Sequence, residues 1–105
     1  MTTFDKREEG FEKKFVVDEE LKFKAEARRN NLLGLWVAEQ LGIRGDAASA
    51  YAKQIVAADF DGAGHAARKV TTDLAAKGIT LSESELRTKM DELTALAIAQ
   101  VKAGA

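Results

Sequence analysis

The apolar residues of this chain recur every three or four positions, and no proline interrupts them. An α-helix gathers residues with this spacing on one face, whereas a strand requires strict alternation. Alanine, the strongest helix former, is also frequent along the chain. The sequence therefore predicts an all-α fold.

Four segments carry the helical pattern and are separated by short breaks that contain glycine. They cover residues 18–41, about 47–60, 63–77 and about 83–101. Asp18 can act as an N-cap for the first helix, while Ser82 and Glu85 have the spacing of a capping box at the start of the fourth. Because the connections are short, we expect antiparallel neighbours in a four-helix bundle over residues 19–105.

The apolar face of each predicted helix supplies the predicted core. These faces consist of Leu32, Leu33, Leu35, Trp36, Val37 and Leu41; Ala47, Ala50, Tyr51, Ile55, Val56 and Phe60; Ala66, Ala67, Val70 and Leu74; and Leu86, Met90, Leu93, Ala97 and Val101. A chain of 105 residues has room for one such core.

Residues 1–29 differ in composition from the rest of the chain. They hold 8 of the 16 basic and 8 of the 17 acidic residues, yet Phe4, Phe11 and Phe15 recur among them at helical spacing. On a helix these rings would lie within about 40° of one another and form an aromatic seam. Gly10 costs about 1 kcal/mol relative to alanine, and so short a helix nucleates poorly. We therefore predict that residues 1–18 form a separate segment, disordered or marginally helical until a surface covers the rings.

Two kinds of surface could cover the aromatic seam of Phe4, Phe11 and Phe15. The rings can pack back on the bundle, or they can enter a groove of a partner protein. The charged residues around the seam favour the partner, since a helix with one narrow apolar stripe suits a groove. A membrane surface fits poorly, because residues 1–18 carry four basic and five acidic side chains.

The composition argues against several classes of function. A net charge of −1 gives no excess of basic residues for nucleic acid. The absence of cysteine excludes disulfides and thiolate metal sites. Neither a signal peptide nor a run of about 20 apolar residues is found, so we expect a cytoplasmic protein without direct membrane insertion.

No motif brings together the groups that catalysis requires. His65 has no nucleophile beside it and reads as an exposed residue at a helix start. DFDG, at residues 59–62, lacks the later oxygen ligands of a calcium loop, and GIRG, at residues 42–45, lacks a neighbouring sheet. GAGHAARK offers Arg68 and Lys69 to a phosphate but departs from the phosphate-loop pattern. We therefore predict that the protein is not an enzyme.

The runs TTFDKREEGFEKKF and DEELKFKAEARRNNLLGLWVAEQLG resemble the zeta subunit of alphaproteobacterial F-type ATP synthase. The resemblance covers the whole chain in length and helix pattern, and it is densest over residues 2–42. It implies a natural inhibitor of ATP hydrolysis in which the bundle is a carrier. The N-terminal segment would become helical when inserted between the alpha and beta subunits, reach the gamma rotor and block rotation.

The resemblance also implies which residues contact the partner. The expected contacts are Phe4, Arg7, Glu8, Phe11, Glu12, Lys14 and Phe15. Arg7 and Lys14 would seek carboxylates, and the rings would be the desolvated anchors. Further along the chain, Lys24, Arg28 and Arg29 either extend this contact or form a solvated face.

An alternative reading of the resemblance concerns nucleotides. Some family members look like weak binders of adenine nucleotide, so this chain could instead be a nucleotide-responsive module without strong inhibitory activity. Apart from such weak binding, no cofactor or metal is expected. The protein is expected to be monomeric when free and, through its binding to ATP synthase, peripheral to the inner membrane. Gly10 and the pair Val16 and Val17 depart from the family pattern in ways that weaken an autonomous helix.

Overall fold

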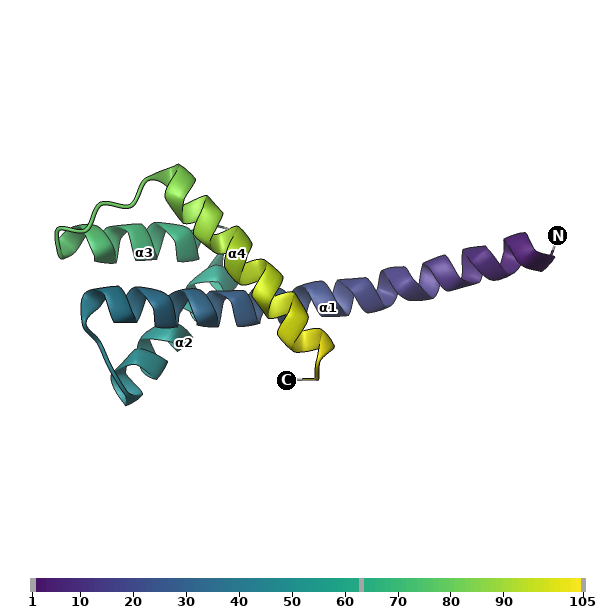
Figure 1. Cartoon of the computed structure of the whole chain (residues 1–105), viewed down its shortest axis with the longest axis horizontal. Coiled ribbons are helices and arrows are strands. Elements are labelled where there is room, and N and C mark those ends of the chain that lie inside the picture. Colours follow the sequence, from purple (N-terminus) through teal and green to yellow (C-terminus); the bar gives the residue numbers. More distant parts are fainter. Residues whose placement is uncertain (1, 63, 105) are drawn as a thin grey trace.

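The computed structural model describes the backbone of residues 2–62 and 64–104, and the side chains of residues 19–62 and 64–104. The four helices are α1 (Thr2–Leu41), α2 (Asp46–Asp61), α3 (His65–Ala76) and α4 (Glu83–Lys102). Within the described backbone there is no strand. The predicted all-α class with four helices is confirmed (Figure 1).

Helix α1 is the element on which the other three helices pack (Figure 1). Its C-terminal half lies beside α2 and α3, and α4 crosses it. Helices α2 and α3 also contact each other. Gly34 permits the close approach of α1 and α2, because a β-carbon at this position would lie 2.5 Å from the Cα of Ala52.

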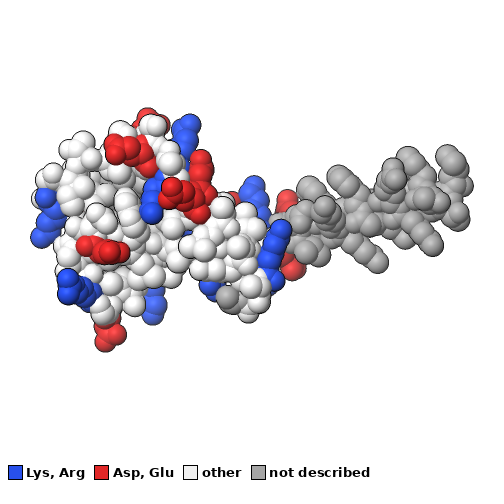
Figure 2. Space-filling model, in the orientation of Figure 1, with Lys and Arg blue, Asp and Glu red and all other residues white. Residues whose placement is uncertain are grey.

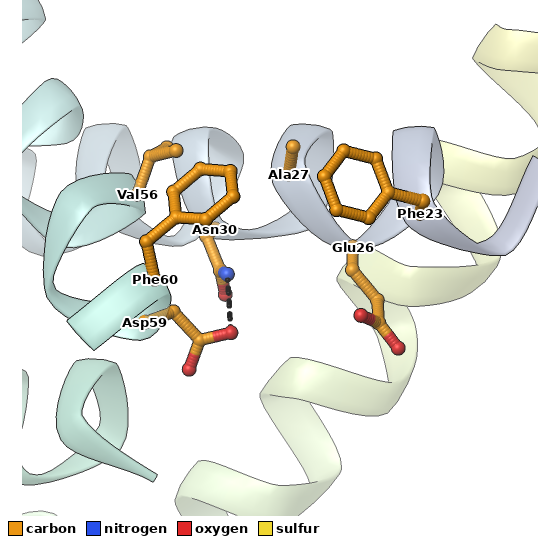
Figure 3. A pocket seen from close by; sticks show the side chains of 7 residues that line it. All are labelled: Phe23, Glu26, Ala27, Asn30, Val56, Asp59 and Phe60. Atoms are coloured by element: carbon orange, nitrogen blue, oxygen red, sulfur yellow. Dashed lines mark hydrogen bonds between the residues drawn. The ribbon is translucent and has the colours of Figure 1, made fainter. Parts of the chain in front are cut away.

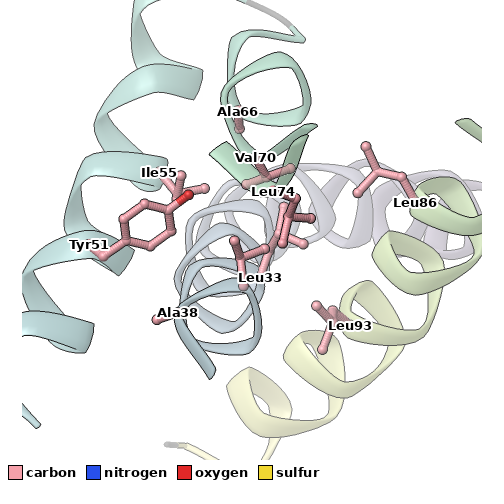
Figure 4. Close-up of a cluster of buried hydrophobic side chains, with 10 residues drawn as sticks. Leu33, Ala38, Tyr51, Ile55, Ala66, Val70, Leu74, Leu86 and Leu93 are labelled. Carbon is pink, nitrogen blue, oxygen red and sulfur yellow. The ribbon is translucent and has the colours of Figure 1, made fainter. Parts of the chain in front are cut away.

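The core lies around the C-terminal half of α1 (Figure 4). Its largest fully buried side chains are Leu33, Val37, Ile55, Val70 and Leu74. Helix α4 adds Leu86, Leu93 and Ala97. The core residues predicted for α3 and α4 are confirmed as buried or partly buried.

The predicted core was wrong at four positions. Phe60 is 66% exposed and Leu35 is 37% exposed, and Ala47 and Ala50 are also exposed. Phe60 follows buried Ile55 by five residues, which corresponds to about 140° around a helix. Its ring therefore points away from the face that α2 turns toward the core.

The helix ends follow the predicted signals at α4 but not at α1. Ser82 Oγ accepts a hydrogen bond from the Glu85 amide at 3.0 Å, and Glu85 Oε1 accepts one from the Ser82 amide at 3.2 Å, so the predicted capping box is confirmed. Helix α1 begins at Thr2 instead of Asp18. No proline precedes Asp18, and lysine, arginine and glutamate, which are good helix formers, recur among residues 2–17, so the helix can begin before Asp18.

Candidate functional site

The predicted partner contacts all belong to the N-terminal part of α1. Phe4, Arg7, Glu8, Phe11, Glu12, Lys14 and Phe15 lie outside the residues whose side chains the structure describes. The described surface begins with the next turns of the same helix, from Glu19 onward.

Three basic residues on these turns were singled out from the sequence, Lys24, Arg28 and Arg29, and they have different environments. Lys24 is exposed. Arg28 Nη1 donates to Gln100 Oε1 on α4 at 3.0 Å. Arg29 Nη2 lies 4.0 Å from Asp59 Oδ2 on α2. The two arginines therefore tie α1 to its neighbours, while Lys24 faces solvent.

Two phenylalanines form an exposed pair across α1 and α2. The ring centroids of Phe23 and Phe60 lie 6.0 Å apart with an interplanar angle of 57°. Phe23 is 60% exposed and Phe60 is 66% exposed, so each ring covers only part of the other. Sequence reasoning assigned Phe60 to the core and gave Phe23 no role. The signal that could have located the pair is the placement of each ring among charged residues, in KFK and DFD.

A small hollow of about 170 Å³ lies beside this aromatic pair (Figure 3). Its lining consists of Phe23, Glu26, Ala27, Asn30, Val56, Asp59 and Phe60. The carboxylates of Glu26 and Asp59 lie on the same side of the two rings. The hollow thus combines an apolar wall with an acidic edge.

Asn30 fixes the inner wall of the hollow. It is only 2% exposed, and its Nδ2 donates to Asp59 Oδ2 at 3.0 Å. Its Oδ1 accepts a hydrogen bond from Arg29 Nε at 3.2 Å. Because both ends of the buried amide are engaged, α1 and α2 are held in one register at this point.

A second polar cluster joins α2 to α3. Tyr51 Oη donates to Asp73 Oδ2 at 2.7 Å, and Lys69 Nζ donates to the same oxygen at 3.0 Å. Burial raises the pKa of Tyr51, and the hydrogen bond to Asp73 and its negative charge raise it further. Burial would raise the pKa of Asp73 as well, but the bonds from Tyr51 and Lys69 and the charge of Lys69 outweigh this effect and lower it.

The basic residues considered for phosphate binding lie at the start of α3. His65 is the first residue of α3 and is exposed, as predicted. Beside it an open hollow is lined by Ala58, His65, Arg68, Lys69, Thr72 and Asp73. Arg68 and Lys69 are the two cations considered for a phosphate. Lys69 already forms an ion pair with the carboxylate of Asp73.

The described surface carries both signs of charge. Figure 2 shows basic and acidic side chains interspersed on the face in view, without an extended area of one sign. Among the described residues, no group of histidine and carboxylate side chains could hold a metal ion. No helix in the described part of the chain combines the length and hydropathy needed to cross a membrane.

Comparisons with known proteins place this arrangement in a family. The family model described as ATPase inhibitor subunit zeta matches residues 1–100. Among curated proteins, none gives a significant match. The chain is similar to a protein whose solution NMR structure is known, with 52% sequence identity and a TM-score of 0.68. The match covers 81% of this chain and 99% of the chain in that structure. Since the family match extends over nearly the whole sequence, this chain belongs to the ATPase inhibitor subunit zeta family.

Proposed function

We propose that this protein inhibits ATP hydrolysis by the F-type ATP synthase by inserting residues 1–18, as a helix, between an alpha and a beta subunit of the catalytic head. The inserted segment reaches the gamma rotor and blocks its rotation. The observation that carries the proposal is the family match, which begins at residue 1 and so includes the proposed inhibitory segment. A subunit of this kind regulates an enzyme and does not itself catalyse a reaction.

The placement of residues 2–18 on the central helix supports this mechanism. Helix α1 runs from Thr2 to Leu41, so the proposed inhibitory segment and the core share one helix. An anchor that is folded beforehand reduces the entropy lost when the segment is inserted. The rings of Phe4, Phe11 and Phe15 would supply buried anchors, and Arg7 and Lys14 would pair with carboxylates of the partner.

The proposal is tested by comparing the full chain with residues 18–105. Each is added to purified F-type ATP synthase while ATP hydrolysis is followed. The full chain should inhibit and the truncated chain should not. Because residues 33–97 supply most of the core, the truncated chain should unfold in urea with nearly the same midpoint, as measured by the fluorescence of Trp36.

Two results would contradict this mechanism. Equal inhibition by both chains would move the inhibitory surface onto the bundle. Loss of the folded state on truncation would show that residues 1–17 belong to the core. A third variant, in which Phe4, Phe11 and Phe15 are changed to alanine in the full chain, separates loss of the anchors from loss of length.

The alternative, a nucleotide-responsive module, would use the hollow beside His65 and Arg68. The bond between Lys69 and Asp73 weighs against it, because a phosphate would have to compete with a carboxylate already in place. Titration with ADP, followed by amide chemical shifts of residues 62–73, tests this alternative. If a set of these amide shifts moves and saturates with ADP, the nucleotide-responsive module is favoured over an inhibitor that does not respond to nucleotide.

A further inference from the structure

We propose that the exposed pair Phe23 and Phe60, with the hollow between α1 and α2, is a second docking surface for the catalytic head of the ATPase. The inference rests on the proposed function, because it takes the same head as the partner. The surface would receive an apolar side chain of the head with a basic residue next to it.

The exposure of the aromatic pair is the first argument. Large apolar side chains that remain uncovered and adjacent mark interaction sites, whereas single exposed ones are common on any surface. Phe23 and Phe60 are 60% and 66% exposed, and their rings lie 6.0 Å apart. Leu35 and Leu96 are the other large apolar residues exposed among the described residues, at 37% and 46%, and neither lines this hollow.

The size of the hollow indicates what kind of ligand it fits. Sites for small molecules and cofactors usually enclose about 300–1,000 Å³. The hollow beside the aromatic pair measures about 170 Å³, which is too small for a nucleotide but suits one side chain of a protein. Val56 and Ala27 complete an apolar wall beside the rings (Figure 3). An apolar side chain entering from a partner would therefore be covered on several sides.

The charges at the edge of the hollow indicate which kind of residue should lie next to the apolar side chain of the partner. Asp59 already accepts a hydrogen bond from Asn30 and lies near Arg29. Glu26 also lines the hollow, but within the side chains that the structure describes no ion pair or hydrogen bond involves it. A lysine or arginine of the partner would find in Glu26 a carboxylate that still lacks an opposite charge.

The position of Phe23 connects this surface with the proposed inhibitory segment. Phe23 lies on α1, eight residues after Phe15, which corresponds to about 12 Å along a helix axis. A head that holds residues 4–15 is thus close to the turn that carries Phe23. Asn30 locks α2 against α1 at this point, so Phe60 is already in place and little ordering is required on docking.

The experiment measures binding and inhibition separately. Because the chain has no cysteine, Ser49→Cys provides a single site for a fluorescent label on the exposed start of α2. Anisotropy of the labelled chain gives the Kd for purified ATPase head, and ATP hydrolysis gives the inhibition. The variants are Phe23→Ala, Phe60→Ala and Glu26→Lys, with Leu96→Ala as the matched control for removal of an exposed apolar side chain.

We expect Phe23→Ala and Phe60→Ala each to raise the Kd about ten-fold, as is usual for an anchor residue. Glu26→Lys should also raise it, because it reverses the charge that faces the partner. Leu96→Ala should change the Kd by less than about two-fold. All four variants should keep the urea midpoint of the parent chain, since none of these side chains is buried. Unchanged Kd values for both phenylalanine variants would overturn the inference.

The two proposals fail in different ways. If the parent chain binds the head but does not inhibit hydrolysis, the proposed function is wrong. The docking surface then stands if Phe23→Ala or Phe60→Ala weakens binding, and falls if neither does. If the parent chain inhibits and the phenylalanine variants match it in Kd, only the docking surface is wrong. If the parent chain does not bind the head at all, both proposals are overturned.

Discussion

Asp73 links the stability of the bundle to pH. Its Oδ2 accepts hydrogen bonds from Tyr51 and Lys69, and these bonds lower its pKa below the ordinary value of 3.8 despite partial burial. A carboxyl group whose pKa is lower in the folded state stabilises that state above the unfolded pKa. This stabilisation is lost as the pH falls through the folded value.

We predict that Asp73→Asn removes part of the acid sensitivity of folding. The parent chain should lose unfolding free energy as the pH falls below about 4, and the variant should lose less, because its side chain does not titrate. Urea unfolding followed by Trp36 fluorescence at pH 7, 4 and 3 measures the difference. Asp91→Asn, at an exposed position of α4, is the control and should resemble the parent. Identical pH dependence of parent and Asp73→Asn would contradict the assignment.

The sequence could not have paired these side chains. Tyr51 and Asp73 lie 22 positions apart, and Asn30 and Asp59 lie 29 positions apart. Helical periodicity relates residues within one helix and carries no information on how two helices are rotated against each other. Polar partners between helices therefore emerged only from the packed structure. The assignment of Phe60 to the core was a different error, because its offset of about 140° from Ile55 around the same helix already places the two side chains in different directions.

Single helices were more accessible to sequence reasoning. Ser82 and Glu85 predicted the start of α4, and the spacing from Leu86 to Ala97 predicted its buried face, because both signals are local. The central position of α1 was not predicted. Its apolar residues cover a wide face in a short stretch, which is compatible with either a central or a peripheral helix. Gly34 contributes to this arrangement, since it lets α2 approach α1 closely.

We predict that Gly34→Ala destabilises the bundle by about 1–3 kcal/mol, as overpacking usually does. This loss should exceed the gain of about 1 kcal/mol that alanine brings to a helix interior. The added β-carbon would lie 2.5 Å from the Cα of Ala52, which is a backbone atom. Ala52→Gly should therefore fail to rescue Gly34→Ala. Urea unfolding of the single and double variants tests this, and full rescue would show that the clash involves only side chains.

At the scale of the whole molecule, α1 contributes side chains to the core and also carries most of the proposed inhibitory segment. In the proposed mechanism, folding of the bundle and insertion into the ATPase would thus depend on different stretches of one helix. A substitution that changes the helix propensity of the N-terminal stretch should then alter inhibition without altering the core. Gly10 is the position where propensity can be changed most simply.

We predict that Gly10→Ala strengthens inhibition about three- to five-fold. Alanine favours a helix by about 1 kcal/mol over glycine, and the proposed bound state of residues 1–18 is helical. The concentration for half-maximal inhibition of ATP hydrolysis is the measurement, and the urea midpoint from Trp36 fluorescence should stay constant. Weaker inhibition by the alanine variant would argue that the segment does not bind as a continuous helix.

The central place of α1 also has a mechanical consequence. In the proposed mechanism a rotor would push on the inserted segment, and Leu33 and Val37 would have to slide past the side chains of three other helices before α1 could move. Such sliding breaks many contacts at once instead of one after another. Resistance to a forced displacement is governed by the rate of unfolding and not by the equilibrium free energy. In the proposed mechanism the bundle would therefore hold against the motor for as long as its unfolding is slow.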